Sequence, residues 1–144
     1  MEVWYQESLK KNWFSYKVES YKVVDNLILI NHNKNWGLDE ELVQKLAKKA
    51  LIEKNFHKDV ELSVYFVGRK KAKDLNVNYR KMSYIPQVLG FPMSMETDVD
   101  GKIRLGDIVI CTQKLKYEVK FQKSTLEKVL YAWLVHGVEN LMKG

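Results

Sequence analysis

The first candidate for a functional site is a run of basic residues at 68–81. Six basic side chains stand there against one acid, Asp74. A local excess of positive charge is what contact with a phosphate backbone requires, although a charge run is also typical of a solvated helix face. The predicted phosphate-binding patch consists of Arg69, Lys70, Lys71, Lys73 and Lys81, with Arg80 beside it.

The second candidate is a histidine in a predicted C-terminal helix. Residues 124–141 carry an apolar stripe of helical period, and Ser124 and Glu127 at its start have capping-box spacing. His136 and Asn140 are one helical turn apart at the edge of this stripe. We expect both side chains at the boundary of core and solvent, where a groove could expose them.

The other reactive residue types favour structural roles. His32 and His57 have no partner at metal-ligand spacing, and Cys111, at the end of a predicted strand, is typical of a small buried apolar residue. The sequence contains no H-E-x-x-H, no P-loop and no G-x-G-x-x-G motif.

Alternating helices and strands are expected to position these residues in one α/β (α+β) domain with a small mixed sheet of about four strands. Apolar periodicity predicts strands at 27–30, 60–67 and 103–111, a loop at 31–35, and helices at 38–54, 70–79 and 124–141. Pro86 and Pro92 bracket an extended segment, which places it at a sheet edge because proline cannot donate to a ladder.

Three local features refine this arrangement. Asp98–Gly101 has the composition of a hairpin turn. In the strand that follows, the apolar alternation changes phase, which predicts a bulge near Gly106–Asp107. Residues 113–121 alternate apolar and charged side chains, as a strand would.

Composition limits the class of protein. The 144 residues fit one domain, and the net charge of +6 is compatible with nucleic acid. A single cysteine and the absence of a long apolar run indicate a cytoplasmic protein without a membrane partner. Residues 1–26 hold six of the 17 aromatic residues, so we expect an N-terminal extension that packs on the domain, 27–144, or on a partner.

Four segments in order resemble the YbeY family of bacterial endoribonucleases, which act in ribosomal RNA maturation. They are Leu75-Asn76-Val77-Asn78-Tyr79-Arg80, Val88-Leu89-Gly90-Phe91-Pro92, Leu105-Gly106-Asp107-Ile108-Val109-Ile110 and Val135-His136-Gly137-Val138-Glu139-Asn140-Leu141. The resemblance covers about residues 27–144 and implies that 113–121 is helical. It also implies RNA as substrate, Arg80 as a catalytic residue that holds phosphate, and zinc as cofactor.

The implied zinc site departs from the family pattern. Three family histidines bind the metal; the first aligns with His136, the second with Asn140, and the third would fall two residues beyond Gly144. Pro86-Gln87 and Gly90 also replace polar family residues. The resemblance therefore implies a degenerate or C-terminally truncated site in which zinc binds weakly or not at all, since zinc prefers imidazole, thiolate or carboxylate ligands.

Three hypotheses follow for the function. The first is a metal-dependent single-strand endoribonuclease of ribosomal RNA, impaired by the missing histidines. The second is a non-catalytic RNA- or ribosome-binding module on the same scaffold, with ribosomal RNA and possibly ribosomal proteins as partners. The third is a protein-interaction domain. Arg80 also has an alternative role, a structural one, in which it joins its loop to the last helix.

Overall fold

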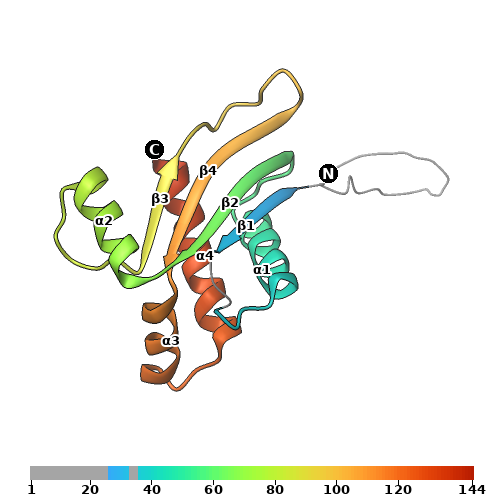
Figure 1. Ribbon diagram of the computed structural model, residues 1–144. Coiled ribbons are helices and arrows are strands. Elements are labelled where there is room, and N and C mark those ends of the chain that lie inside the picture. Colours follow the sequence, from blue (N-terminus) through green and yellow to red (C-terminus); the bar gives the residue numbers. More distant parts are fainter. Residues whose placement is uncertain (1–25, 33–35) are drawn as a thin grey trace.

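A computed structural model describes residues 26–32 and 36–144 (Figure 1). Its elements follow one another as β1 (Leu27–His32), α1 (Glu40–Glu53), β2 (Asp59–Val67), α2 (Arg69–Arg80), β3 (Val88–Pro92), β4 (Lys102–Cys111), α3 (Thr112–Phe121) and α4 (Leu126–Lys143). The predicted α/β (α+β) class is confirmed. The predicted extension, 1–26, lies outside the described residues except for Asn26, whose buried side-chain oxygen accepts a hydrogen bond from the Val60 amide at 3.1 Å.

The four strands form one mixed sheet in the order β1-β2-β4-β3. β1, β2 and β4 are parallel neighbours, and β3 pairs antiparallel with β4 at the edge of the sheet. The edge position predicted from Pro86 and Pro92 is therefore confirmed. It leaves one side of β3 without a neighbouring strand, as proline requires.

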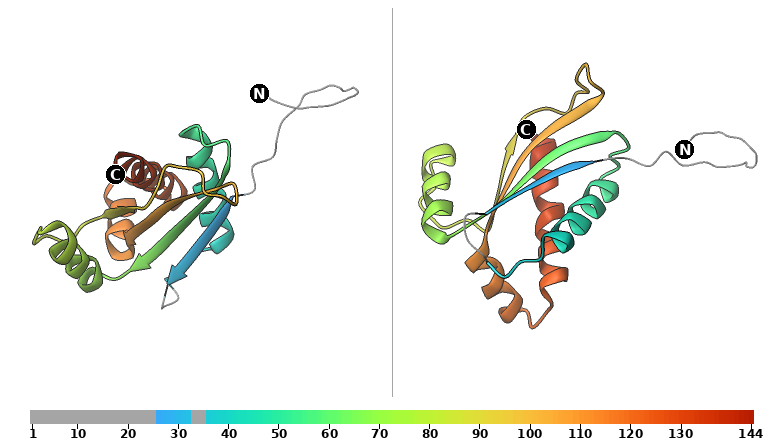
Figure 2. Two further views of the ribbon diagram at one scale, coloured as in Figure 1. Left: turned by 90° about the horizontal axis from the view of Figure 1, so that it is seen from above. Right: turned by 45° about the vertical axis from the view of Figure 1, so that its right-hand side comes forward.

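One face of the sheet, here called the inner face, holds the core. The alternating residues of β2 that point inward are almost fully buried, among them Leu62, Val64 and Phe66. α1 and α4 pack together on this face, with the apolar stripe of α4 turned to the sheet (Figure 2). Among the described elements, α2 covers part of the opposite, outer face, and Leu27 and Leu29 of β1 are exposed there.

The predicted bulge in β4 is present. Glu61 pairs with Arg104 and the next residue of β2, Leu62, pairs with Gly106, so Leu105 is the extra residue. Gly106 has a φ of +138°, and a Cβ there would lie 2.3 Å from the carbonyl oxygen of Phe91. Glycine is required at this position because no side chain fits between the two strands.

Two local predictions were wrong. The N-cap of α4 is Thr125 rather than Ser124, and its hydroxyl accepts the hydrogen bond of the Lys128 amide at 3.2 Å. Asn31 and His32 belong to β1 rather than to a loop; the rest of that loop, 33–35, lies outside the described residues.

The helix that the family resemblance implied for 113–121 is confirmed as α3. The period-two pattern does not mark a strand there, because Leu115 faces the core while Tyr117 and Phe121 are exposed on another side of the helix.

Candidate functional site

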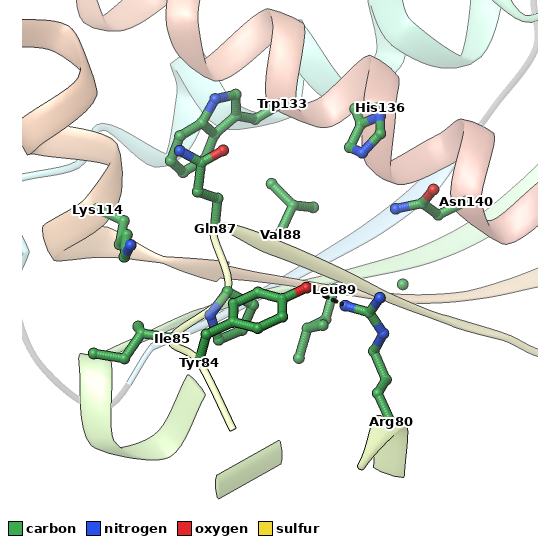
Figure 3. Close-up of a pocket in the computed structure, with 12 residues that line it drawn as sticks. Arg80, Tyr84, Ile85, Gln87, Val88, Leu89, Lys114, Trp133, His136 and Asn140 are labelled. Carbon is green, nitrogen blue, oxygen red and sulfur yellow. Dashed lines mark hydrogen bonds between the residues drawn. The ribbon is translucent and has the colours of Figure 1, made fainter. Parts of the chain in front are cut away.

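A pocket of about 750 Å³, here called the site pocket, lies between α4 and the segment that joins α2 to β3 (Figure 3). α4 presents Trp133, His136 and Asn140 to it, three residues spaced to share one side of a helix. Arg80 points across the pocket toward this side from the end of α2. The complete lining is Arg80, Tyr84, Ile85, Pro86, Gln87, Val88, Leu89, Gly90, Lys114, Trp133, His136 and Asn140.

Arg80 is held in place by the segment that follows it. Its Nη1 donates to the side-chain oxygen of Asn76 at 3.3 Å and to the Tyr84 hydroxyl at 3.4 Å. Asn76 is fully buried, and its amide nitrogen donates to the backbone oxygen of Tyr84 at 2.9 Å. Only one of the guanidinium nitrogens is used in these bonds, so the other two keep donors to spare.

His136 lies opposite Arg80 and belongs to a chain of polar contacts. Its Nδ1 is 3.9 Å from an oxygen of Glu139, whose other oxygen accepts from the ammonium of Lys54 at 2.5 Å. The hydrogen bond and charge of Lys54 lower the pKa of Glu139 below its usual value. Glu139 is thereby kept ionised beside His136, although it does not itself line the pocket.

α4 comes close to the sheet here because two contact positions are glycine. A Cβ on Gly137 would lie 2.9 Å from side-chain carbons of Ile108, and one on Gly90 would lie 2.9 Å from the Cβ of Asn140. Carbon atoms in contact normally stay about 3.5–4.0 Å apart. The two glycines therefore set the depth at which His136 and Asn140 sit over β3.

The lining is cationic and contains no carboxylate among the described residues. Arg80 and Lys114 supply positive charge from opposite ends, and Trp133 and Tyr84 supply aromatic rings. Such a lining favours an anionic ligand with an aromatic part.

The residues predicted from the sequence are brought together only in part. Arg80, His136 and Asn140 share the site pocket. The predicted patch on α2 lies outside it: Arg69, Lys70, Lys73 and Lys81 are exposed, and Lys70 pairs with Asp74 at 3.2 Å. Lys71 lines a different cavity, on the outer face.

The lining residues Tyr84, Lys114 and Trp133 were missed by sequence reasoning. Trp133 was assigned to the core stripe, and it is indeed 8% exposed. Its spacing of three residues from His136 was an available signal, because such pairs share a helix side. Nothing in the local sequence distinguishes Lys114 from the other lysines of α3.

Comparisons with known proteins show the family of this chain. The sequence model of the family described as Endoribonuclease YbeY matches residues 29–142. The chain belongs to the endoribonuclease YbeY family. The family resemblance stated from the four sequence segments is therefore confirmed, as is the α+β fold that it implied.

Relatives in this family share about a third of the aligned residues. The chain is 31% identical to Endoribonuclease YbeY of Alkaliphilus oremlandii over 127 residues, 86% of this chain and 76% of that protein. It is 30% identical to Endoribonuclease YbeY of Aquifex aeolicus over 125 residues, 87% of this chain and 81% of that protein. The solution structure of TM1509 from Thermotoga maritima superposes with a TM-score of 0.51 at 26% identity, over 80% of this chain and 71% of that one.

The donors present at the pocket do not fit the zinc that the family resemblance implied. His136 is the one imidazole there, and Asn140 offers only an amide. In the described part of the chain no three His, Cys, Asp or Glu side chains come together as a metal-binding group. The same part of the chain contains no helix long and apolar enough to cross a membrane.

Proposed function

We propose that this chain binds single-stranded RNA in the site pocket, with Arg80 and Lys114 as the phosphate contacts. The observation that carries this proposal is the lining itself, which joins two cations and two aromatic rings with no carboxylate among the described residues. Backbone phosphates favour the cations, and unpaired bases favour aromatic surfaces. The family name supports RNA as the class of substrate.

Arg80 is proposed as the principal contact. A guanidinium can donate two parallel hydrogen bonds to one phosphate, which a lysine cannot do. The bonds to Asn76 and Tyr84 fix its direction before RNA arrives, so little side-chain freedom is lost on binding. This supports a binding role over a merely structural tie, because Arg80 makes no hydrogen bond to α4 in the contacts above.

Cleavage of the bound strand is proposed to be weak. The family relatives are named endoribonucleases, but Asn140 stands where the family pattern has a second histidine, and no metal-activated step can be built from the donors present. His136 remains beside the expected phosphate position as a hydrogen-bonding group. Ribosomal RNA as the target, ribosomal proteins as partners and the cytoplasm as location belong to the same proposal and rest on the family resemblance.

The binding test measures fluorescence anisotropy of a labelled single-stranded RNA from the 3′ end of small-subunit ribosomal RNA. Arg80→Ala should weaken binding by about tenfold or more, because hydrogen bonds to charged groups contribute about 1.5–3 kcal/mol. It should also lower the slope of log affinity against log salt by about 0.7, the value for one phosphate contact on a single strand.

Two matched variants complete the test. Lys45→Ala removes an exposed cation from α1, on the other side of the molecule, and should change affinity by less than about twofold. Arg69→Ala removes an exposed cation from the patch on α2. If Arg69→Ala weakens binding as much as Arg80→Ala does, the patch and not the pocket binds RNA.

Cleavage is followed on the same RNA with added zinc and with a chelator. We expect intact RNA in both. Zinc-dependent cleavage that is lost in Arg80→Ala would overturn the proposal of weak catalysis and leave RNA binding in place.

A further inference from the structure

A second cavity, of about 360 Å³, lies on the outer face of the sheet beneath α2. We refer to it as the outer cavity. Its volume is within the range of small-molecule sites, about 300–1,000 Å³. Its lining is mostly apolar and aromatic and consists of Tyr65, Val67, Lys71, Leu75, Tyr79, Phe91, Asp107 and Val109.

The strand register explains how one carboxylate comes to lie among these apolar groups. Asp107 of β4 is flanked by its partners Ser63 of β2 and Phe91 of β3, so all three point to the outer face. Burial raises the pKa of Asp107, and a hydrogen bond from Ser63 partly offsets this. Tyr79 closes the side of the cavity, with its ring 5.5 Å from that of Phe91 and nearly perpendicular to it.

The two cavities are lined by neighbouring residues of the same two elements, α2 and β3. Tyr79 and Arg80 are consecutive at the end of α2, and the first lines the outer cavity while the second lines the site pocket. Gly90 and Phe91 of β3 divide in the same way between the two cavities. β3 is the edge strand of the described sheet, so an RNA strand that runs past this edge lies next to residues of both cavities.

We infer that the outer cavity binds a guanine base of the RNA strand whose phosphate is held by Arg80, an inference that rests on the proposed function. The rings of Tyr79 and Phe91 offer faces and edges for stacking. The ionised carboxylate of Asp107 accepts hydrogen bonds and cannot donate them. Guanine is the RNA base with two adjacent donors, N1–H and the N2 amino group, on its Watson–Crick edge, so it matches Asp107 in two bonds.

Lys71 gives the strand a continuation. It is exposed and lines the outer cavity in the first turn of α2, and we assign to it a further phosphate of the same strand. A base between Arg80 and Lys71 therefore has a phosphate contact at each side and an acceptor at its edge. Adenine, cytosine and uracil each present at most one donor flanked by an acceptor, and they leave one oxygen of Asp107 unmatched.

The test compares two short labelled RNAs by anisotropy, oligo-U with one central guanine and oligo-U with one central adenine. The full chain should prefer the guanine strand at least about fivefold, the lower end of discrimination by a two-bond base contact. Asp107→Asn should abolish the preference. Tyr79→Leu should weaken the binding of both strands, and Tyr117→Leu, which removes a tyrosine of similar exposure (64% against 68%) from α3, should leave both unchanged.

Free guanosine locates the site independently of any phosphate. In amide NMR spectra of the full chain, guanosine should shift the signals of Tyr65, Asp107 and Val109, and adenosine should shift them less. Arg80→Ala should leave these shifts in place while it weakens both RNAs and keeps their ratio.

The outcomes separate the two proposals. Arg80-dependent RNA binding without a guanine preference, or with a preference that Asp107→Asn preserves, overturns the base site and leaves the proposed function standing. Guanosine shifts without RNA binding overturn the proposed function and the strand path together. If guanosine shifts none of the amide signals of the outer cavity, the inference is refuted. The outer cavity is then filled by another part of the chain or reserved for a protein partner.

Discussion

The contact between Gly137 of α4 and Ile108 of β4 yields a quantitative prediction. A Cβ on residue 137 would lie 2.9 Å from two side-chain carbons of Ile108 and 3.1 Å from a third. Ile108 is fully buried, so it has no free space to move into. Overpacking of this kind costs about 1–3 kcal/mol, while replacing a helical glycine with alanine gains about 0.8–1 kcal/mol. We expect Gly137→Ala to lower the free energy of unfolding by up to about 2 kcal/mol, the difference between these two terms.

The assay is urea denaturation followed by circular dichroism, in a double-mutant cycle with Ile108→Ala. Ile108→Ala alone should cost about 2–5 kcal/mol through the cavity it leaves. In the double variant the new methyl group of residue 137 enters that cavity, so the two changes should couple favourably by about 1–3 kcal/mol. Ala132→Gly, on the exposed side of the same helix, measures the difference in helix propensity between alanine and glycine without any change in packing.

Two results would refute the reasoning. The first is a Gly137→Ala variant that is more stable by about 1 kcal/mol, which is what helix propensity alone predicts. The second is an additive cycle, which would mean that residue 137 and Ile108 are not in steric contact. If a variant changes the dependence of the unfolding free energy on urea concentration, its denatured state is altered. The variants should then be compared by their urea midpoints.

Three further predictions concern residues around the two cavities. Gly106→Ala should cost about 3 kcal/mol or more, seen as a large fall in Tm, because a side chain there meets the Phe91 oxygen in a backbone conformation that alanine avoids. Asn76→Ala should cost about 1–3 kcal/mol by leaving buried partners unsatisfied, and should speed amide exchange across 82–87. Asp107 has a raised folded-state pKa, so the folded protein binds more protons than the unfolded chain as the pH rises above 3.8, and stability falls over that window. Asp107→Asn removes this loss of stability with rising pH. In urea denaturation the variant should therefore gain more stability over the parent at pH 7 than at pH 3. An equal gain at both pH values would contradict the raised pKa of Asp107.

The fold was predictable where one signal dominated. The strict alternation of β2 set both its type and its inner face, and the two prolines around β3 fixed its edge position before any pairing was known. The period-two pattern of 113–121 did not indicate its structure, because Leu115 is buried while Tyr117 and Phe121 are exposed on another side of α3; the helix there followed only from the family resemblance. Ser124 and Thr125 are both good N-caps, so only the backbone geometry distinguishes them.

Single residues of the site could be predicted from the sequence, but the pocket that they form together could not. Arg80 and His136 were found because their segments match a family pattern, and the structure places both at one pocket. Lys114 and Trp133 were missed because their role depends on how α3 and α4 lie against β3, which no local pattern encodes. The outer cavity was missed for the same reason, since it combines residues of α2, β2, β3 and β4.

The paired glycines under α4 also bear on how the site pocket can move. At Gly137 the side chain of Ile108 lies against the backbone of the helix, and at Gly90 the side chains of Asn140 and Leu141 lie against the backbone of the strand. Ile108 and Leu141 are almost fully buried, so these interlocked contacts resist both lifting of α4 from the sheet and sliding of α4 along its axis. The side of the pocket that carries His136 should therefore stay fixed, and a change in the distance between His136 and Arg80 should come from movement of the segment that carries Arg80.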